Sequence, residues 1–179
     1  MLLKNILPAF LAAIVVLVCA CGSSDLPSLP SNMTKPTINV VPENWSLEED
    51  SPYGTYEDDS GDTQWGLIYY TDQTDQDLVL IYYGDVPSEL KGHENDENAL
   101  IERATLEASE FYGIDETGSM TIAGNIAGYV KGYDPETDTY DLDIVFVDHA
   151  TCLDIYAAFH PTDDDEAEVM SLINSISMD

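Results

Sequence analysis

Residues that could act as a nucleophile or a base gather near the end of the chain: Asp148, His149, Cys152 and His160. A cysteine nucleophile needs a base within hydrogen-bond reach and an oxyanion site, and no residue pattern here supplies the second. The chain has no HExxH, phosphate-loop, GxSxG or dinucleotide-binding motif. We therefore expect 148–151 to be a turn between two strands, Cys152 to be a buried small apolar residue, and no catalytic residue.

The acidic segment 134–141 (DPETDTYD) places oxygen ligands at alternate positions, as a calcium-binding loop does. It has Thr139 where such a loop needs glycine and Val145 where it needs a bidentate glutamate. The simpler interpretation is an acidic hairpin turn between two strands. Two other acidic groups match the pattern less well: Asp72, Asp75 and Asp77, and Glu57, Asp58, Asp59 and Asp62. We assign no metal ligand and no cofactor, and weak calcium binding stays open.

The first twenty residues form a separate segment. Lys4 supplies a positive charge, and residues 6–20 (ILPAFLAAIVVLVCA) are apolar and interrupted only by Pro8. As a helix this stretch would span about 22 Å, less than the roughly 30 Å hydrocarbon core of a bilayer. Such a length is typical of a signal peptide.

Cys21 follows this segment in a context that resembles the lipobox of prokaryotic lipoproteins. Val18 stands at the aliphatic position and Ala20 at the small position before the cysteine; Cys19 stands where serine, alanine or threonine is usual. Cys19 itself does not fit as the modified residue, because branched Val18 would precede it. The resemblance implies a lipid on Cys21 that anchors the chain to the extracytoplasmic face of the cell membrane. An uncleaved N-terminal anchor and a simple secretory signal are the alternatives.

Residues 22–36 (GSSDLPSLPSNMTKP) are rich in serine and proline and lack a hydrophobic period, which is typical of a flexible linker. We therefore expect a signal peptide at 1–20, a lipidated cysteine and linker at 21–36, and a domain at 37–179. With Cys21 acylated, Cys152 has no partner for an internal disulfide. Asn32 and Asn44 begin N-x-S/T sequons, and whether either carries a glycan stays open.

The charge is far from average. There are 35 Asp+Glu against 5 Lys+Arg, a formal net charge of -30. Phosphate binding needs lysine and arginine to displace counterions, so this balance argues against nucleic acid as a partner. It attracts cations and basic partners, and it is also typical of adaptation to salty surroundings, where self-repulsion is screened. The expected partners are the membrane, through the lipid, and a protein.

Six segments predict β-strands by their length, their β-branched and aromatic content and the turn residues that bound them: 37–41, 64–71, 78–83, 120–133, 140–147 and 153–159. Residues 72–77 are expected to connect a hairpin. The pairs Tyr69–Tyr70 and Tyr82–Tyr83 each place one ring on either face of the sheet. Those rings either lie beneath a flanking helix or form a surface for binding.

Two segments have helical periodicity. In 95–112 one apolar stripe is expected to contain Leu100, Ile101, Ala104, Ala108, Phe111 and Tyr112. Asn95 or Asp96 is the expected N-cap, and Gly113 the expected glycine after the C-terminus. The second helix begins at an N-cap threonine, Thr162, with aspartates in its first turn. Its apolar stripe is Val169, Leu172, Ile173 and Ile176.

Several local motifs resemble the Mog1/PsbP-like fold. They are 40–45 (VVPENW), which is similar to the family's opening strand, 123–129 (AGNIAGY), 153–156 (LDIY) and the closing helix. The resemblance covers about 37–176 and implies an α+β domain, an antiparallel β-sheet flanked by helices in an α/β/α sandwich. It also implies a binding or assembly-assisting module and not an enzyme.

We therefore expect a surface-anchored lipoprotein with a non-catalytic binding or assembly role. The alternatives are a calcium-dependent surface binding module and a hydrolase without a recognised motif. A deep pocket with convergent polar groups would favour the hydrolase.

Overall fold

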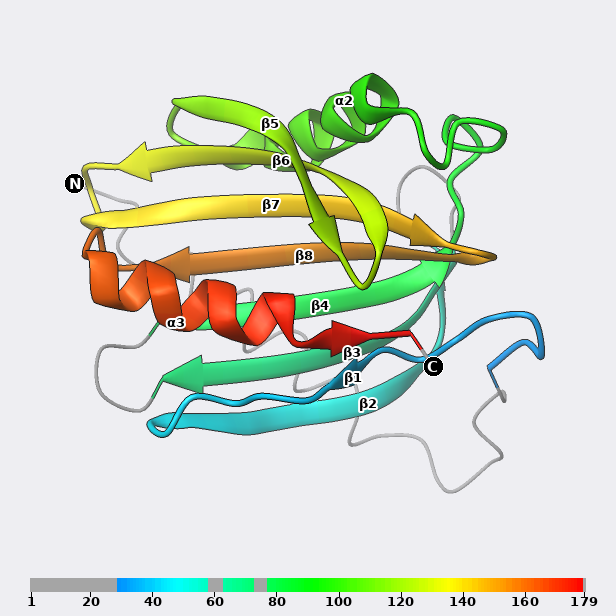
Figure 1. The fold of residues 1–179 in the computed structure, drawn as a ribbon, viewed down its shortest axis with the longest axis horizontal. Helices are drawn as coiled ribbons and strands as arrows, with labels where there is room; N and C mark the ends of the chain where they lie inside the picture. Colours follow the sequence, from blue (N-terminus) through cyan, green and yellow to red (C-terminus); the bar gives the residue numbers. More distant parts are fainter. Residues whose placement is uncertain (1–28, 58–62, 73–76, 179) are drawn as a thin grey trace.

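The computed structural model describes residues 29–57, 63–72 and 77–178. This part of the chain forms a mainly antiparallel α+β fold, in which a seven-stranded sheet carries α-helices on its two faces (Figure 1). This arrangement confirms the expected α+β class, an antiparallel sheet with flanking helices.

The large sheet consists of two meanders that meet in its middle. Its strands are β2 (Trp45–Glu57), β3 (Thr63–Asp72), β4 (Leu78–Asp85), β5 (Glu116–Ile122), β6 (Asn125–Asp134), β7 (Thr139–Asp148) and β8 (Thr151–Phe159). The spatial order is β2-β3-β4-β8-β7-β6-β5, and every pair is antiparallel. Only β4 and β8 are neighbours that do not follow each other in the chain, so the helix between β4 and β5 lies in the crossover.

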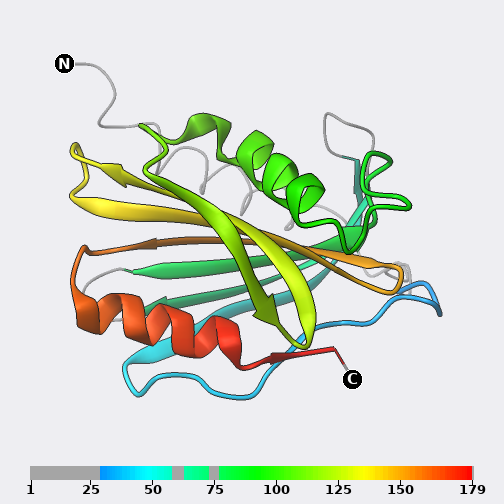
Figure 2. The same cartoon turned by 45° about the horizontal axis from the view of Figure 1, so that its top comes forward.

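The two α-helices of the described chain cover opposite faces of this sheet. Helix α2 (Glu97–Glu107) lies across β5, β6 and β7, whereas α3 (Asp163–Asn174) lies on the other face (Figure 2). Because a helix covers each face, alternate side chains of strand β7 are buried on opposite faces of the sheet. Leu142, Ile144 and Phe146 are buried in the cluster on the α3 side, and Val145 and Val147 in the cluster on the α2 side.

Polar contacts fix α3 at both halves of the sheet. The Lys131 ammonium on β6 pairs with Glu166 at 2.8 Å and lies 4.2 Å from the centre of the Tyr140 ring. In the other half of the sheet, the Trp45 indole N–H at the start of β2 donates to Glu168 at 2.9 Å. Both contacts are partly buried, which makes them stronger than exposed ones. Helix α3 therefore joins two strands that are distant in the sheet.

Helix α2 approaches strand β6 so closely that β6 can carry no side chain there. A Cβ atom built on Gly128 would lie 2.3 Å from the backbone of Leu100 and Ile101 in α2. Four residues further along β6, a Cβ on Gly132 would lie 1.9 Å from the carbonyl oxygen of Gly113. These two glycines form a flat track that seats α2 and the chain after it against the sheet.

The helix starts were predicted correctly, and one helix end was not. Asp96 caps α2 by accepting the N–H of Asn98, and Thr162 caps α3 by accepting the N–H of Asp165. Helix α2 ends at Glu107 and passes into a 3-10 turn, Ala108–Glu110, so Gly113 is not its C-terminal glycine. The cause is tertiary: Phe111 turns to an extended backbone, and its ring packs 6.2 Å from the ring of Tyr156 on the sheet.

Three strand predictions need correction. Edge strand β2 was missed, because an edge exposed to solvent tolerates acidic residues, glycine and proline. The segment 120–133 is two strands, since Ala123 (φ 51°) and Gly124 (φ 83°) form a tight turn between β5 and β6. The segment 37–41 contributes only β1 (Thr37–Ile38), which pairs with β9 (Ile176–Ser177) in a separate two-stranded sheet.

The glycine track can be tested by Gly128→Ala. The added methyl group would collide with backbone and not with a flexible side chain, so we expect a loss of at least about 2 kcal/mol in the free energy of unfolding. Urea denaturation measures this. The control is Gly113→Ala, whose Cβ meets nothing within 4 Å and should cost no more than about 0.5 kcal/mol. Equal costs for the two variants would contradict the close packing.

Candidate functional site

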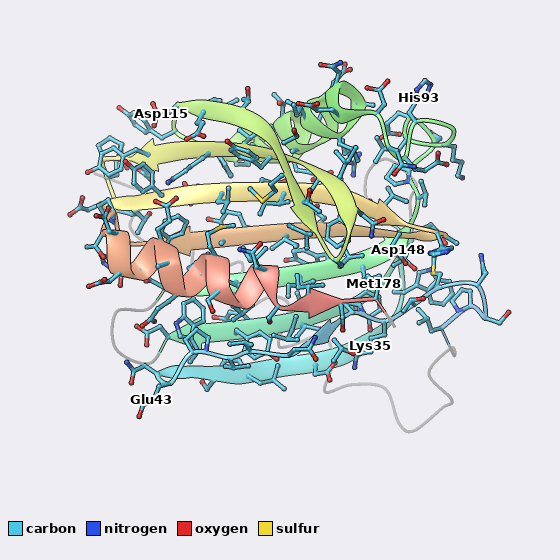
Figure 3. The ribbon with its side chains drawn as sticks, in the orientation of Figure 1. Lys35, Glu43, His93, Asp115, Asp148 and Met178 are labelled. Atoms are coloured by element: carbon cyan, nitrogen blue, oxygen red, sulfur yellow. The ribbon has the colours of Figure 1, made fainter. Side chains whose placement is uncertain are left out.

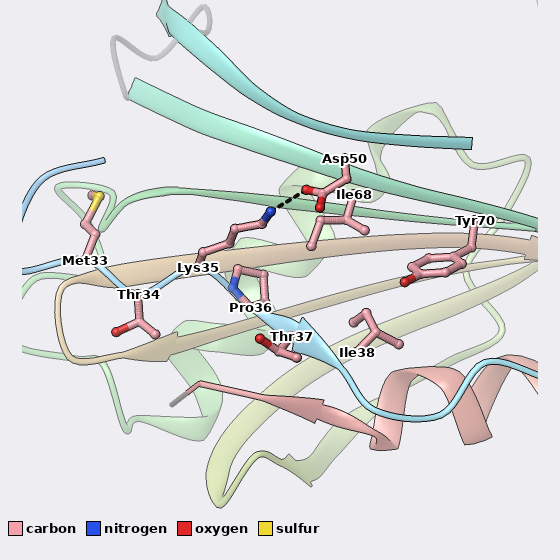
Figure 4. Close-up of a pocket in the computed structure, with 9 residues that line it drawn as sticks. All are labelled: Met33, Thr34, Lys35, Pro36, Thr37, Ile38, Asp50, Ile68 and Tyr70. Carbon is pink, nitrogen blue, oxygen red and sulfur yellow. Dashed lines mark ion pairs between the residues drawn. The ribbon is translucent and has the colours of Figure 1, made fainter. Parts of the chain in front are cut away.

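A cavity of about 640 Å³ lies on the α3 side of the sheet, between the segment 33–38 and the strands β2 and β3 (Figure 4). This volume is in the range of small-molecule sites, roughly 300–1,000 Å³. Ile68 and Tyr70 of β3 are buried and form its floor, and Asp50 of β2 stands at one side. The opposite wall consists of Met33, Thr34, Lys35, Pro36, Thr37 and Ile38.

The cavity wall includes residues that were predicted to belong to a flexible linker. Met33 is buried, and the Thr34 N–H donates to the Thr151 hydroxyl at 2.9 Å. Downstream, the pairing of β1 with β9 holds the wall at its other end. Residues 33–36 are therefore packed on the domain, and the packed part of the chain includes residues ahead of Thr37. The reason is tertiary: Thr34 is held by a residue 117 positions away in the sequence.

One ion pair crosses the cavity. The Lys35 Nζ lies 2.5 Å from the Asp50 Oδ1, and both side chains remain accessible, at 44% and 38% exposed (Figure 4). Burial, and then the negative charge of Asp50, raise the pKa values of Tyr70 and Tyr83. Of these two tyrosines, Tyr70 lines the cavity. The cavity therefore combines an apolar floor, one tyrosine and a pair of opposite charges.

The tyrosine pairs occupy both faces, as predicted. Tyr70 and Tyr83 are in the core on the α3 side, with the Tyr83 ring lying directly over Gly66. Tyr69 and Tyr82 are half-buried on the opposite face. Across that face the strand registers place in one row Tyr69, Leu80, Tyr156 and Asp143.

Asp143 is the member of this row on β7 and is buried, with 4% of its surface exposed. Its Oδ1 has no hydrogen-bond partner in the part of the chain that the structure describes. Burial, followed by the charges of Asp154 and Glu107, holds the pKa of Asp143 well above its usual range, although the Arg103 guanidinium acts in the opposite direction. This carboxyl is the most perturbed acid of the second face.

The residues near the end of the chain do not form a nucleophile and base. Asp148 lies where β7 ends, at the edge of the fold (Figure 3). His149 follows it in the turn between β7 and β8, with its side chain 85% exposed and its Nδ1 3.0 Å from Asp148. Cys152 is buried in the cluster beneath α2, as expected of a small apolar residue. His160 is held elsewhere, because its Nδ1 and its N–H both contact the buried Asp77 carboxylate, at 2.8 and 3.0 Å.

The acidic segment 134–141 is a hairpin turn between β6 and β7, as the simpler interpretation predicted. Its carboxylates bond to the protein: Asp134 accepts the Glu136 N–H, Asp138 the Tyr133 hydroxyl and Asp141 the Tyr156 hydroxyl. Of the other two acidic groups, Asp58, Asp59, Asp62 and Asp75 lie outside the described residues. Among the residues described, no three histidine, cysteine or acidic side chains are grouped so as to hold a metal ion.

The sequence patterns did not single out Lys35 or Asp50, and they marked Asp77 only as a member of an acidic group. Lys35 gave no signal beyond being a rare cation, and Asp50 is one acid among many. The predicted lipidation residue Cys21, with its signal peptide, lies outside the described residues, so its modification stays a prediction. The sequon residues Asn32 and Asn44 are both exposed.

No protein-family model matches the chain, and no curated protein matches it. Among solved structures, the chain is similar to LpqN, which is involved in cell envelope biogenesis of Mycobacterium tuberculosis. The two share 18% sequence identity with a TM-score of 0.46, over 83% of this chain and 86% of that chain. A likeness at this level does not assign a function. Within the described ranges, no helix is long and apolar enough to cross a membrane.

The buried Asp143 carboxyl predicts a pH-dependent stability. Because its folded pKa is raised above the unfolded value of roughly 3.9, its contribution to stability is complete at low pH. That contribution is lost as the pH rises from about 4 towards the folded pKa. We therefore expect the stability of the wild type, relative to Asp143→Asn, to fall with rising pH.

Urea denaturation of both proteins across this range measures the difference. Glu136→Gln, which removes one exposed negative charge from the β6–β7 turn, is the control for net charge. A difference between wild type and Asp143→Asn that is independent of pH would contradict the raised pKa.

Proposed function

We propose that the chain is a membrane-anchored lipoprotein, held by a lipid on Cys21 at the extracytoplasmic face, whose domain binds a ligand without catalysis. The observation that carries the binding role is the cavity beneath residues 33–38. Its lining offers an apolar floor and one ion pair, but no histidine or cysteine. A hydrolase would need a nucleophile and a base converging on such a cavity.

The same proposal includes the finer fold assignment. The antiparallel sheet with helices on both faces supports a Mog1/PsbP-like sandwich, in which binding and assembly roles are usual. Binding of calcium by the acidic surface is the weaker alternative, because the carboxylates of the 134–141 turn already accept hydrogen bonds from the protein. A protein partner remains part of the proposal, since a tethered domain meets other envelope proteins.

The anchor is tested by Cys21→Ala. Without the thiol no lipid can be attached, so we expect the variant to move from the membrane fraction to the soluble fraction. Cys19→Ala is the matched control, because it changes the neighbouring cysteine that does not fit the lipobox, and it should stay with the membrane. Membrane association of Cys21→Ala would contradict the lipid anchor.

The cavity is tested by filling it. Thr37→Trp adds an indole to a lining position on β1, and Val40→Trp adds the same group at an exposed position outside the lining. The intact protein, extracted from its own membranes, is examined by native mass spectrometry. We expect a bound small molecule on the wild type and on Val40→Trp, and at least a tenfold lower occupancy on Thr37→Trp (about 1.4 kcal/mol).

The binding role would be wrong if the wild type carried no ligand, or if Thr37→Trp retained it fully. Circular dichroism of the tryptophan variants checks that both are folded.

A further inference from the structure

The ion pair in the cavity is easily opened. Lys35 precedes β1 and Asp50 belongs to β2, and both side chains remain in contact with solvent. Exposed pairs of this kind contribute little to stability, because water solvates each charge almost as well. The fold therefore does not depend on this pair. Both residues line the cavity, so a ligand bound there would contact both charges.

We propose that the cavity binds a compact zwitterion with an apolar substituent, such as an apolar α-amino acid, and this rests on the proposed function. The ligand's ammonium group replaces Lys35 at the Asp50 carboxylate, and the ligand's carboxylate replaces Asp50 at the Lys35 ammonium. Each charge of the protein keeps an opposite charge beside it, so the exchange leaves no charge unpaired.

The surroundings of each charge fit this arrangement. Asp50 and Tyr70 line the same cavity, so an ammonium group at Asp50 lies on the side of an aromatic ring, where cations are favoured. The apolar substituent contacts Ile38 and Ile68, which line the same cavity (Figure 4). Burial of that substituent supplies the hydrophobic part of the affinity.

The contact between the two charges favours a compact zwitterion. Lys35 Nζ and Asp50 Oδ1 are in contact in the structure, so a ligand whose two charges are close together parts them with the smallest movement of either side chain. An α-amino acid meets this condition because one carbon carries both groups, whereas the termini of a peptide are farther apart. We therefore expect a free amino acid to bind better than the corresponding dipeptide.

The charge of the whole chain excludes the simpler ligands. An anion would have to approach a protein of net charge -30 and lie beside Asp50. A cation is attracted at long range but meets Lys35 in the cavity. A zwitterion has no net charge and satisfies both groups, so the local pair decides what binds.

The proposal is tested by isothermal titration calorimetry of the full chain with four probes at up to millimolar concentration. The probes are leucine, leucinamide (which lacks the carboxylate), N-acetyl-leucine (which lacks the ammonium) and glycine (which lacks the apolar substituent). We expect leucine to bind at least tenfold more tightly than each of the other three, since each of them loses one contact.

Two variants reverse the preference. In Lys35→Gln the unpaired Asp50 should bind leucinamide at least as well as leucine, and in Asp50→Asn the unpaired Lys35 should accept N-acetyl-leucine. The matched controls are Lys91→Gln and Glu136→Gln, which remove one exposed charge of each sign outside the cavity. They should retain the wild-type preference for leucine.

Equal binding of leucine and leucinamide by the wild type would overturn the proposal. So would an unchanged affinity of Lys35→Gln and Asp50→Asn for leucine, or the absence of leucine binding. If leucine does not bind, native mass spectrometry of the Thr37→Trp variant still tests whether the cavity binds any ligand. A ligand lost on filling the cavity would leave the binding function intact and exclude only the zwitterion.

Discussion

The contact between helix α2 and strand β6 is the constraint on which the arrangement of the second face depends. With no side chain at Gly128, the backbone of α2 lies directly on the sheet, and Gly132 admits the chain that follows the helix. Phe111 is thereby brought over Tyr156, and α2 covers β5 to β7. A helix held this closely cannot slide towards β4. The two faces therefore become different: one is closed by α3 along the middle of the sheet, and the other has its helix at one end.

The parts of this fold that could be predicted are those determined by nearby residues. Asp96 and Thr162 cap helices through N–H groups two or three positions away, and the alternation of Leu142, Ile144 and Phe146 follows from the period of a strand. Strand β2 could not be predicted this way. At the edge of the sheet its residues need not alternate, and its pairing with β3 is interrupted by irregular registers.

The cavity could not be predicted from sequence patterns, for the same physical reason. Its wall and floor come from segments whose contacts are long-range, such as Thr34 with Thr151 and Lys35 with Asp50. Nothing in the local composition of 33–36 distinguishes it from the linker residues ahead of it. The buried carboxylate of Asp77 is a similar case, since a hairpin-loop acid is held by a histidine 83 positions away.

The position of the cavity links the proposed anchor to the proposed ligand. Residues 33–36 stand between Cys21 and the body of the domain in sequence, and they also form one wall of the cavity. A ligand that takes the place of Asp50 at Lys35 would therefore contact the segment that follows the proposed anchor in the sequence. Met33 and the Thr34 contact with Thr151 keep that wall attached when the ion pair opens, because neither involves Asp50. The wall can thus exchange its charged contact for one with a ligand and still remain packed on the sheet.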